Sequence, residues 1–482
     1  MLLSQLLKDV EIAEPFKDVE IRFITDNSQN VTVGCAFVCI EGTHNDGHLF
    51  ARLALSKGAK VIICERNLNL ENQIIVKNSK KAYAKMCSAF FGYPSEKLNL
   101  FAITGTNGKT TTAFLLKNII EANGEKCGLI GTVKEMAGDV SFSSQYTTPD
   151  AFQLQCLFNK MVLRGCSCCV MEASSQALSQ GRLDGCSFKS AIFTNITQDH
   201  LDYHKSFEEY LKAKKRLFYK TKTAVINIDD SNSSIMAEAL TCEVVSYSAQ
   251  TNNAVFTADD ILYSPDSVSY KLIYKGKGYP VKVNMPGIFS VYNSLSALAC
   301  AISYGFDIEK CVEAVSKSKG VSGRAEIVPT KTDYNVMIDY AHSPDSLENI
   351  LKTIKQYSRG RIITVFGCGG DRDKSKRAIM GRVAADLSDI AIVTSDNPRT
   401  EKPEAIIDDI KKGIEQSGKN NALFITDRRE AISKALNIAQ KDDVVLLAGK
   451  GHETYQILGE EKIHFDEREV IAELLNGNNQ NE

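Results

Sequence analysis

The stretch from Leu100 to Thr112 constrains the fold of this chain more than any other segment. An apolar run that ends at Thr104 leads into a glycine turn, and Gly108-Lys109-Thr110 then opens a segment of helical character. Backbone N–H groups and the positive end of a helix can face a phosphate chain, while the lysine reaches the outer phosphates and the threonine hydroxyl ligates Mg2+. The sequence therefore predicts an α/β domain whose first strand carries a triphosphate-binding loop, with ATP as the ligand.

The loop is a variant of the commonest phosphate-binding pattern. Gly-x-x-x-x-Gly-Lys would need glycine at position 103, and the chain has Ile103. For a Gly-Lys-Thr triplet alone an ordinary turn is the alternative, but the strand before it and the helix after it favour phosphate binding. The residues expected to hold the nucleotide in this loop are Gly105, Thr106, Asn107, Gly108, Lys109, Thr110 and Thr111.

Composition and charge indicate small-molecule partners. The 57 Lys and Arg residues nearly balance 59 Asp and Glu residues, so no net field favours nucleic acid or a membrane surface. No segment approaches roughly 18 uninterrupted apolar residues, and the N-terminus carries charges too early for a signal peptide. We therefore expect a cytoplasmic protein without membrane insertion, and a monomer.

The 14 cysteines are scattered through apolar runs, which favours reduced thiols in the core over disulfides. Cys166, Cys168 and Cys169 resemble half of a zinc site. No second Cys/His pair follows at finger spacing, and the run leads into a segment typical of a buried strand. We expect no metal there.

The length of 482 residues, together with the linker-like and turn-rich segments between runs of strands and helices, predicts three α/β domains. Residues 1–97 form a small N-terminal α/β domain, residues 98–328 a central domain with a mostly parallel sheet, and residues 329–482 a third domain that repeats the scheme. Glycines at 367, 369 and 370 suggest a dinucleotide fold in the third domain, but no Gly-x-Gly-x-x-Gly spacing is completed. The strands expected to organise the two larger sheets are Leu100 to Thr104, Cys168 to Met171, Ser190 to Thr194, Thr223 to Asn227, Val336 to Tyr340, Arg361 to Phe366, Ile390 to Thr394, Ala422 to Ile425 and Val444 to Ala448.

Polar clusters follow several of these strands, at the edge where parallel sheets keep ligands. Glu172 directly follows an apolar run and can serve as an oxygen ligand for Mg2+, with a solvated strand end as the alternative. His200 lies in a dense polar segment from Thr194 to His204 and can bind metal through imidazole. Lys214 belongs to a basic segment that, taken alone, is typical of a solvated helix face.

Motifs spread over nearly the whole chain carry a resemblance to one family. Besides the phosphate loop they are Glu172-Ala173-Ser174-Ser175, Asp199-His200-Leu201-Asp202, Asn293, Gly323-Arg324-Ala325-Glu326 and Asp339-Tyr340-Ala341-His342. In this order they are similar to the motifs of the Mur ligase family. The resemblance implies a domain for a uridine nucleotide, a central ATPase domain and a Rossmann-like C-terminal domain that carries the incoming amino acid.

Within the family the resemblance points to the enzymes that add the third residue of the peptidoglycan stem peptide. It implies an ATP-dependent acid–amino-acid ligase of cell-wall synthesis that forms an acyl phosphate on UDP-N-acetylmuramoyl-L-alanyl-D-glutamate. It also implies that Lys109 stabilises the moving phosphoryl group, and that Asn293, Arg324 and Asp339 contact the nucleotide. The implied Mg2+ ligands and catalytic residues are Thr110, Glu172, His200 and Lys214, the last as an N6-carboxylysine formed with CO2.

The resemblance also implies where the acceptor binds. Its positions in this chain are Ser28, Thr147, Thr148, Ser174, Gln180 and Arg182, with the loop from Gly42 to Gly47 beside the uridine nucleotide. Arg182 supplies the planar fork that anions favour. Asn27-Ser28-Gln29 replaces the frequent Asp-Ser-Arg of the family, so the serine is kept without its charged neighbours.

The identity of the added amino acid depends on the loops of the third domain. The positions that match are Arg372, Asp396, Asn397, Pro398, Arg399, Gly449 and Glu453. In diaminopimelate-adding enzymes the Asp-Asn-Pro-Arg motif holds the distal end of meso-2,6-diaminopimelate, and Arg399 can pair with its far carboxylate. L-Lysine, which lacks that carboxylate, and lanthionine are the alternatives.

Two rival functions differ in class. One is another amide ligase on this fold, such as a folylpolyglutamate synthetase or a different Mur enzyme. The other is a P-loop nucleotide switch, which would need a Walker-type Asp and a partner surface. The loops around Asn397 and Glu453 argue against the first, and Glu172 with His200 argues against the second.

Overall fold

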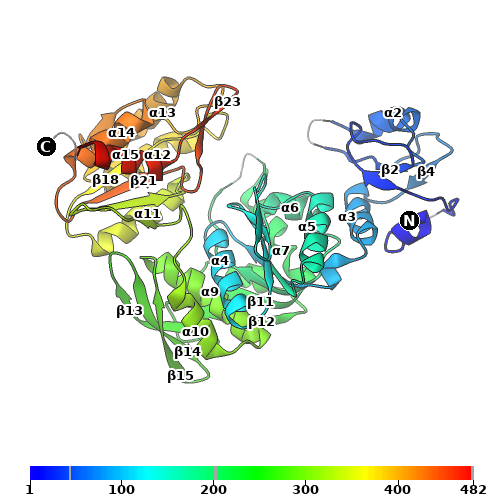
Figure 1. Ribbon diagram of the computed structural model, residues 1–482, viewed down its shortest axis with the longest axis horizontal. Coiled ribbons are helices and arrows are strands. Elements are labelled where there is room, and N and C mark those ends of the chain that lie inside the picture. The colour runs from blue at the N-terminus through cyan, green and yellow to red at the C-terminus, as the bar shows by residue number, and fades with distance from the viewer. Residues whose placement is uncertain (13, 43–44, 200–202, 479–482) are drawn as a thin grey trace.

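A computed structural model describes residues 1–12, 14–42, 45–199 and 203–478. Three separate sheets of four, eleven and six strands follow one another along the chain. A separate two-stranded hairpin follows the third sheet. Figure 1 shows the first sheet and the last at opposite ends of the molecule, with the large central sheet between them. The expected α/β class with three units is confirmed.

The N-terminal unit is a small parallel sheet. Its four strands pair in chain order, and helices cover both faces. The sheet lies between two apolar clusters because successive residues of a strand point to opposite sides: Ala36 and Val38 join one cluster, while Cys35 and Phe37 join the other. Its elements are α1 (Leu3–Leu6), β1 (Phe23–Thr25), β2 (Cys35–Val38), η1 (Gly47–Phe50), α2 (Ala51–Ser56), β3 (Val61–Cys64), β4 (Gln73–Ile75), α3 (Ser79–Phe90) and η2 (Pro94–Glu96).

The central sheet has the order β15-β14-β13-β12-β11-β10-β5-β9-β6-β7-β8. Its middle strands are parallel, from β13 to β6, and both ends are antiparallel extensions. The strands are β5 (Asn99–Thr104), β6 (Cys127–Ile130), β7 (Glu135–Ala137), β8 (Val140–Phe142), β9 (Cys168–Glu172), β10 (Phe188–Phe193), β11 (Thr221–Asn227), β12 (Glu243–Ser248), β13 (Phe256–Tyr263), β14 (Val268–Tyr274) and β15 (Lys277–Val283).

Helices bury both faces of this sheet and thereby fix the end of β5. Phe101 and Ile103 pack with α4 and α9, whereas Leu100 and Ala102 pack with α5 and α7. Each such large apolar side chain contributes about 1.5–3 kcal/mol when it is fully buried. The helices are α4 (Lys109–Ala122), α5 (Ala151–Leu163), α6 (Ser175–Ser179), α7 (Phe207–Lys215), η3 (Phe218–Lys220), α8 (Ser233–Ala237), α9 (Ile288–Tyr304) and α10 (Ile308–Lys317).

The third sheet has the order β16-β17-β21-β18-β19-β20, and all its pairs are parallel except that of β16 with β17. The carboxyl ends of its parallel strands meet at one edge. The elements are β16 (Glu326–Val328), β17 (Asn335–Asp339), α11 (Pro344–Tyr357), β18 (Ile362–Phe366), α12 (Ser375–Leu387), β19 (Ile390–Val393), α13 (Pro403–Ser417), β20 (Ala422–Phe424), α14 (Arg428–Ile438), β21 (Val444–Ala448), β22 (Tyr455–Leu458), β23 (Glu461–His464) and α15 (Glu467–Asn478).

Sequence patterning located four neighbouring parallel strands of the central sheet, β9, β5, β10 and β11, but not the parallel strands β6, β12 and β13 or the antiparallel extensions. The expected strands ending at Thr104, Asn227 and Ala448 end at those residues. In the described part of the chain no helix is long and apolar enough to cross a membrane. All 14 cysteines are free thiols, and Cys168 and Cys169 lie in the buried strand β9.

A close contact between α12 and α13 gives a stability prediction. A Cβ at Gly413 would lie 1.7 Å from the carbonyl oxygen of Ala378. In an open helix Gly→Ala stabilises by about 1 kcal/mol, but here the clash must push the helices apart, so we expect Gly413→Ala to lower the free energy of unfolding by about 2–3 kcal/mol. Urea unfolding measures it. Gln416→Ala, an exposed change on the same helix, should stay within about 0.5 kcal/mol. A Gly413→Ala protein at least as stable as wild type would contradict the contact.

Candidate functional site: a phosphate-loop cavity and an amino-acid loop cluster

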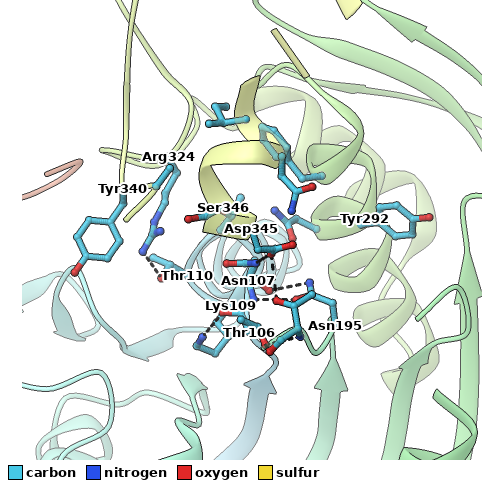
Figure 2. A pocket seen from close by; sticks show the side chains of 18 of the residues that line it. Thr106, Asn107, Lys109, Thr110, Asn195, Tyr292, Arg324, Tyr340, Asp345 and Ser346 are labelled. Atoms are coloured by element: carbon cyan, nitrogen blue, oxygen red, sulfur yellow. Dashed lines mark hydrogen bonds between the residues drawn. The ribbon is translucent and has the colours of Figure 1, made fainter. Parts of the chain in front are cut away.

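A cavity of about 680 Å³ lies over the phosphate loop, between the central sheet and the third unit. Figure 2 shows residues of the loop converging there with Arg324, Tyr340 and Asp345 of the C-terminal part. Gly105 and Gly108 both have positive φ angles, of 151° and 86°, which explains glycine at these turns. The predicted nucleotide-binding residues that line the cavity are Thr106, Asn107, Gly108, Lys109, Thr110, Thr111, Asn293, Arg324 and Asp339.

Two lysines meet at the carbonyl oxygen of Gly105. Lys214 Nζ donates a hydrogen bond of 2.7 Å to it, and Lys109 Nζ donates one of 3.1 Å and another of 2.9 Å to the Thr106 carbonyl. The side chain of Lys214 is buried, so it is not part of a solvated helix face. Burial, and to a lesser degree the Lys109 charge, lower the pKa of Lys214 well below its ordinary value. This lowered pKa favours the neutral amine over the ammonium more than in an exposed lysine.

Glu172 ends β9 beside the loop, as the sequence predicts. It is buried and accepts a hydrogen bond of 3.0 Å from Thr110 Oγ1. The backbone N–H of Thr132 donates to Oε1 at 2.8 Å, and the Thr132 hydroxyl donates to Oε2 at 3.1 Å. The carboxylate and the Thr110 hydroxyl are hard oxygen donors side by side, which fits Mg2+. His200, the third expected ligand, lies outside the described residues.

The remaining residues expected to contact the nucleotide lie in three different segments of the chain. Asn293 of α9 lies directly over Gly108, where a Cβ would lie 2.3 Å from its Oδ1. Arg324 Nη2 lies 3.3 Å from Thr110 Oγ1, and its guanidinium stacks 4.6 Å from the centre of the Tyr340 ring. Asp339, the last residue of β17, accepts a hydrogen bond of 2.7 Å from the N–H of Ala325. The structure thus gathers these residues, and their roles stay predictions.

Asn195 and Asp345 line the cavity although the sequence did not single them out. Asn195 grips Asn107, accepting from its N–H at 2.9 Å and donating to its carbonyl at 3.1 Å. Asp345, near the start of α11, accepts from Asn107 Nδ2 at 2.6 Å and from Thr197 Oγ1 at 3.2 Å. Figure 2 shows Asp345 directed at the loop. Its place at the start of a helix in the third unit was the only available signal.

The residues expected to grip the acceptor dipeptide form one hydrogen-bonded cluster beside Glu172. Thr148 Oγ1 donates to the Glu172 carbonyl at 2.8 Å and accepts from the N–H of Ser174 at 3.0 Å. Arg182 donates to the Thr148 carbonyl at 2.7 Å and to Gln180 Oε1 at 2.9 Å.

Two further positions were expected to contact the acceptor. Thr147 contacts the Thr132 hydroxyl at 3.0 Å, which links this cluster to the carboxylate of Glu172. Ser28 lies apart from the cavity, in the loop after β1, where its carbonyl accepts from Lys57 Nζ at 2.8 Å. Thr43 and His44 of the neighbouring loop lie outside the described residues.

The loops expected to hold the amino acid meet at the carboxyl edge of the third sheet. Asn397 Nδ2 donates to Glu453 Oε2 at 2.8 Å, and a Cβ at Gly449 would lie 3.2 Å from Asp396 Oδ2. Arg399 has a positive φ of 52° and donates to the Gly370 carbonyl at 2.7 Å.

Arg372, Pro398 and a buried arginine complete this edge. Arg372 is exposed and flanks Gly369 together with Arg399, and Pro398 is buried in the loop between them. Arg428, which the sequence did not single out, is fully buried beside Glu467 and donates to the carbonyls of Ser395 at 3.4 Å and Ala448 at 3.0 Å. These carbonyls precede the two loops, so Arg428 ties them together from behind.

The fold and this geometry define an α/β protein with a triphosphate-binding loop on its central sheet. Three family profiles match in order: "Mur ligase family, catalytic domain" at residues 20–89, "Mur ligase middle domain" at residues 103–301 and "Mur ligase, glutamate ligase domain" at residues 323–451.

Relatives and solved structures match almost the full length. The chain is 45% identical over 482 residues to "UDP-N-acetylmuramoyl-L-alanyl-D-glutamate--2,6-diaminopimelate ligase 1" of Clostridium acetobutylicum, covering 98% of this chain and 99% of that protein. A ligase of Clostridioides difficile named for the same substrates is also 45% identical, over 483 residues, with the same coverage. A solved structure of a ligase of this name has a TM-score of 0.72 and 33% identity and covers 99% of both chains. The chain therefore belongs to the Mur ligase family.

The Thr132 hydroxyl gives a prediction for the metal-binding side of the site. Thr132→Val removes its bond to Glu172 while keeping the side-chain shape, and a hydrogen bond to a charged group contributes about 1.5–3 kcal/mol. We expect about a tenfold higher Mg2+ concentration for half-maximal turnover. Titration of activity with Mg2+ measures it, with Thr132→Ser, which keeps the hydroxyl, as the control. An unchanged Mg2+ dependence in Thr132→Val would show that the hydroxyl does not position Glu172.

Proposed function

We propose that this chain is an ATP-dependent ligase that joins meso-2,6-diaminopimelate to UDP-N-acetylmuramoyl-L-alanyl-D-glutamate, a step in cytoplasmic peptidoglycan precursor synthesis. The proposal rests on two sets of residues in one chain. The first is the phosphate loop with Glu172 and the acceptor cluster, and the second is the pair of loops that contain Asp396 and Glu453. The 45% identical relatives bear the names of ligases for these substrates.

The first step activates the acceptor. Its free carboxylate attacks the γ-phosphorus of ATP, the bond to the β–γ bridging oxygen breaks, and an acyl phosphate and ADP result. Lys109 lies in the loop where it can neutralise charge on the transferred group, while Thr110 and Glu172 would hold Mg2+. Bound there, Mg2+ supplies charge neutralisation for the phosphates. The cluster around Thr148 and Arg182 would fix the carboxylate in line.

The second step forms the amide. The amine of the incoming amino acid attacks the acyl carbonyl, the bond to the phosphate oxygen breaks, and phosphate leaves while the nitrogen loses a proton. This needs the amino acid held at the edge of the third sheet and directed at the cavity. Asp396, Asn397 and Glu453 can accept hydrogen bonds from its distal ammonium, and Arg399 can pair with its distal carboxylate.

Within this proposal, Lys214 is carbamylated by CO2. Its neutral amine can attack CO2, forming an N–C bond and losing a proton, so that a cation becomes an anionic oxygen donor. Two observations favour this: the side chain is buried beside Gly105, and its pKa is lowered by burial and then by Lys109. An unmodified ammonium there would repel Mg2+.

The substrate assignment is tested by phosphate release from purified protein with ATP, Mg2+ and the dipeptide acceptor. Each reaction receives meso-diaminopimelate, L-lysine, lanthionine or no amino acid. We expect release to depend on the acceptor and to be faster with meso-diaminopimelate than with L-lysine, because only a distal zwitterion matches both the acidic pair and Arg399. Lanthionine carries the same distal zwitterion, so its rate reports how closely the site fits the length of meso-diaminopimelate. Release without the acceptor would refute the ligase, whereas faster release with lysine would refute only the Arg399 argument.

The carbamate is tested at Lys214. Lys214→Ala should abolish turnover, and short carboxylates such as formate or acetate should partly restore it by supplying the missing oxygen. Lys215→Ala, the neighbouring and less buried lysine on α7, is the matched control and should keep most activity. If no carboxylate restores activity at any concentration, the carbamate loses its support.

A further inference from the structure

Lys450 is a buried cation to which the proposed function gives no role. Its side chain is fully buried at the turn after β21. Its Nζ lies 3.3 Å from Asn397 Oδ1, 3.3 Å from Glu453 Oε2 and 3.6 Å from Asp396 Oδ1. These are the three polar side chains expected to receive the distal ammonium of the amino acid. Lys450 therefore already touches the group that recognises substrate.

The charges around Lys450 do not cancel. Asp396 and Glu453 bring two carboxylates into a mostly buried cluster of polar side chains (the pocket), and Lys450 supplies one positive charge. Oδ1 of Asp396 has no hydrogen-bond partner in the described part of the chain. Burial and the charge of Asp396 raise the pKa of Glu453, while Lys450 opposes that rise. With both carboxylates ionised, the pocket keeps one net negative charge.

A rigid frame holds this pocket next to Arg399. The N–H of Ile457 on β22 donates to Asn397 Oδ1 at 3.0 Å, and the N–H of Arg399 donates to the Ile457 carbonyl at 3.2 Å. Gln456 donates to the carbonyl of Asp396 at 2.7 Å. Asp396, Asn397 and Arg399 therefore belong to one loop fixed against β22, and Lys450 and Glu453 join them from the loop after β21. Their charges match one ammonium and one carboxylate on the same substrate carbon.

We propose that Lys450 is a specificity-determining residue that sets the charge of this pocket to fit a distal zwitterion rather than a lone distal ammonium. The inference rests on the proposed function. With Lys450 present, one substrate ammonium balances the single net negative charge. A substrate carboxylate balances the charge of Arg399, which donates hydrogen bonds to the neutral carbonyls of Gly370 and Asn397. Without it, two carboxylates attract any ammonium more strongly and repel the distal carboxylate of diaminopimelate. The loss of Lys450 therefore favours lysine.

The test compares Lys450→Met with wild type at one mildly alkaline pH, because burial and the charge of Asp396 raise the pKa of Glu453. Phosphate release gives kcat/KM for meso-diaminopimelate and for L-lysine. We expect the ratio of the two values to fall about tenfold or more, because the positive charge that lies 3.3 Å from Glu453 Oε2 is removed from a buried site. Loss of stability alone would lower both values together, so the ratio separates specificity from folding. Lys450→Gln, which keeps a polar end without the charge, should shift the ratio in the same direction.

Lys117→Met is the matched control. Lys117 is also a buried lysine with a carboxylate partner, Glu121 at 2.6 Å, but it lies on α4 of the central unit. Its substitution should leave the ratio unchanged. A wild-type ratio retained in both Lys450 variants would overturn the inference. Wild-type protein whose phosphate release ignores the amino acid would instead overturn the proposed function, so the two failures are distinguishable.

Discussion

The meeting of two lysines at one carbonyl oxygen organises the centre of this molecule. Lys109 approaches the Gly105 carbonyl from the start of α4, and Lys214 approaches it from α7, so the loop after β5 is held between two helices. Two ammonium groups this close repel each other in a buried setting. Burial lowers the pKa of both lysines, and the charge of Lys109 lowers that of Lys214 further, which reduces this repulsion. The burial of Lys214 against the Gly105 carbonyl thus both holds the loop and lowers the pKa of the lysine.

Contacts between units complete the cavity around that loop. Asp345 reaches Asn107 and Thr197 from the third unit, and Arg324 reaches Thr110. Each bond joins a residue next to the expected phosphate position to a segment more than a hundred residues away in the chain. A nucleotide in the cavity would therefore be held by both units at once, which ties triphosphate binding to their relative placement.

The sequence predicted what depends on short-range patterns. Strands such as Leu100 to Thr104 and Val444 to Ala448 are apolar runs bounded by glycine or polar turns, and Glu172 was recognisable because it ends such a run. Strands β12 to β15, of which β14 and β15 pair antiparallel, were missed because half-exposed strands give a weak pattern. Asp345 was missed because its partner Asn107 lies 238 positions away. Lys450 was missed because, although Glu453 is near it in the sequence, Asn397 lies 53 positions away and only folding brings it close.

The segments proposed to bind ATP and those proposed to bind the amino acid rest on different hydrophobic cores. The phosphate loop rests on clusters formed by the central sheet, whereas the loops at Asp396 and Gly449 rest on separate clusters of the third sheet. A change of amino acid preference can therefore accumulate in the loops of the third sheet without repacking the ATP-consuming half. In evolutionary terms the molecule is modular: one energy-coupling part can be inherited unchanged while lineages diverge in the building block that they attach.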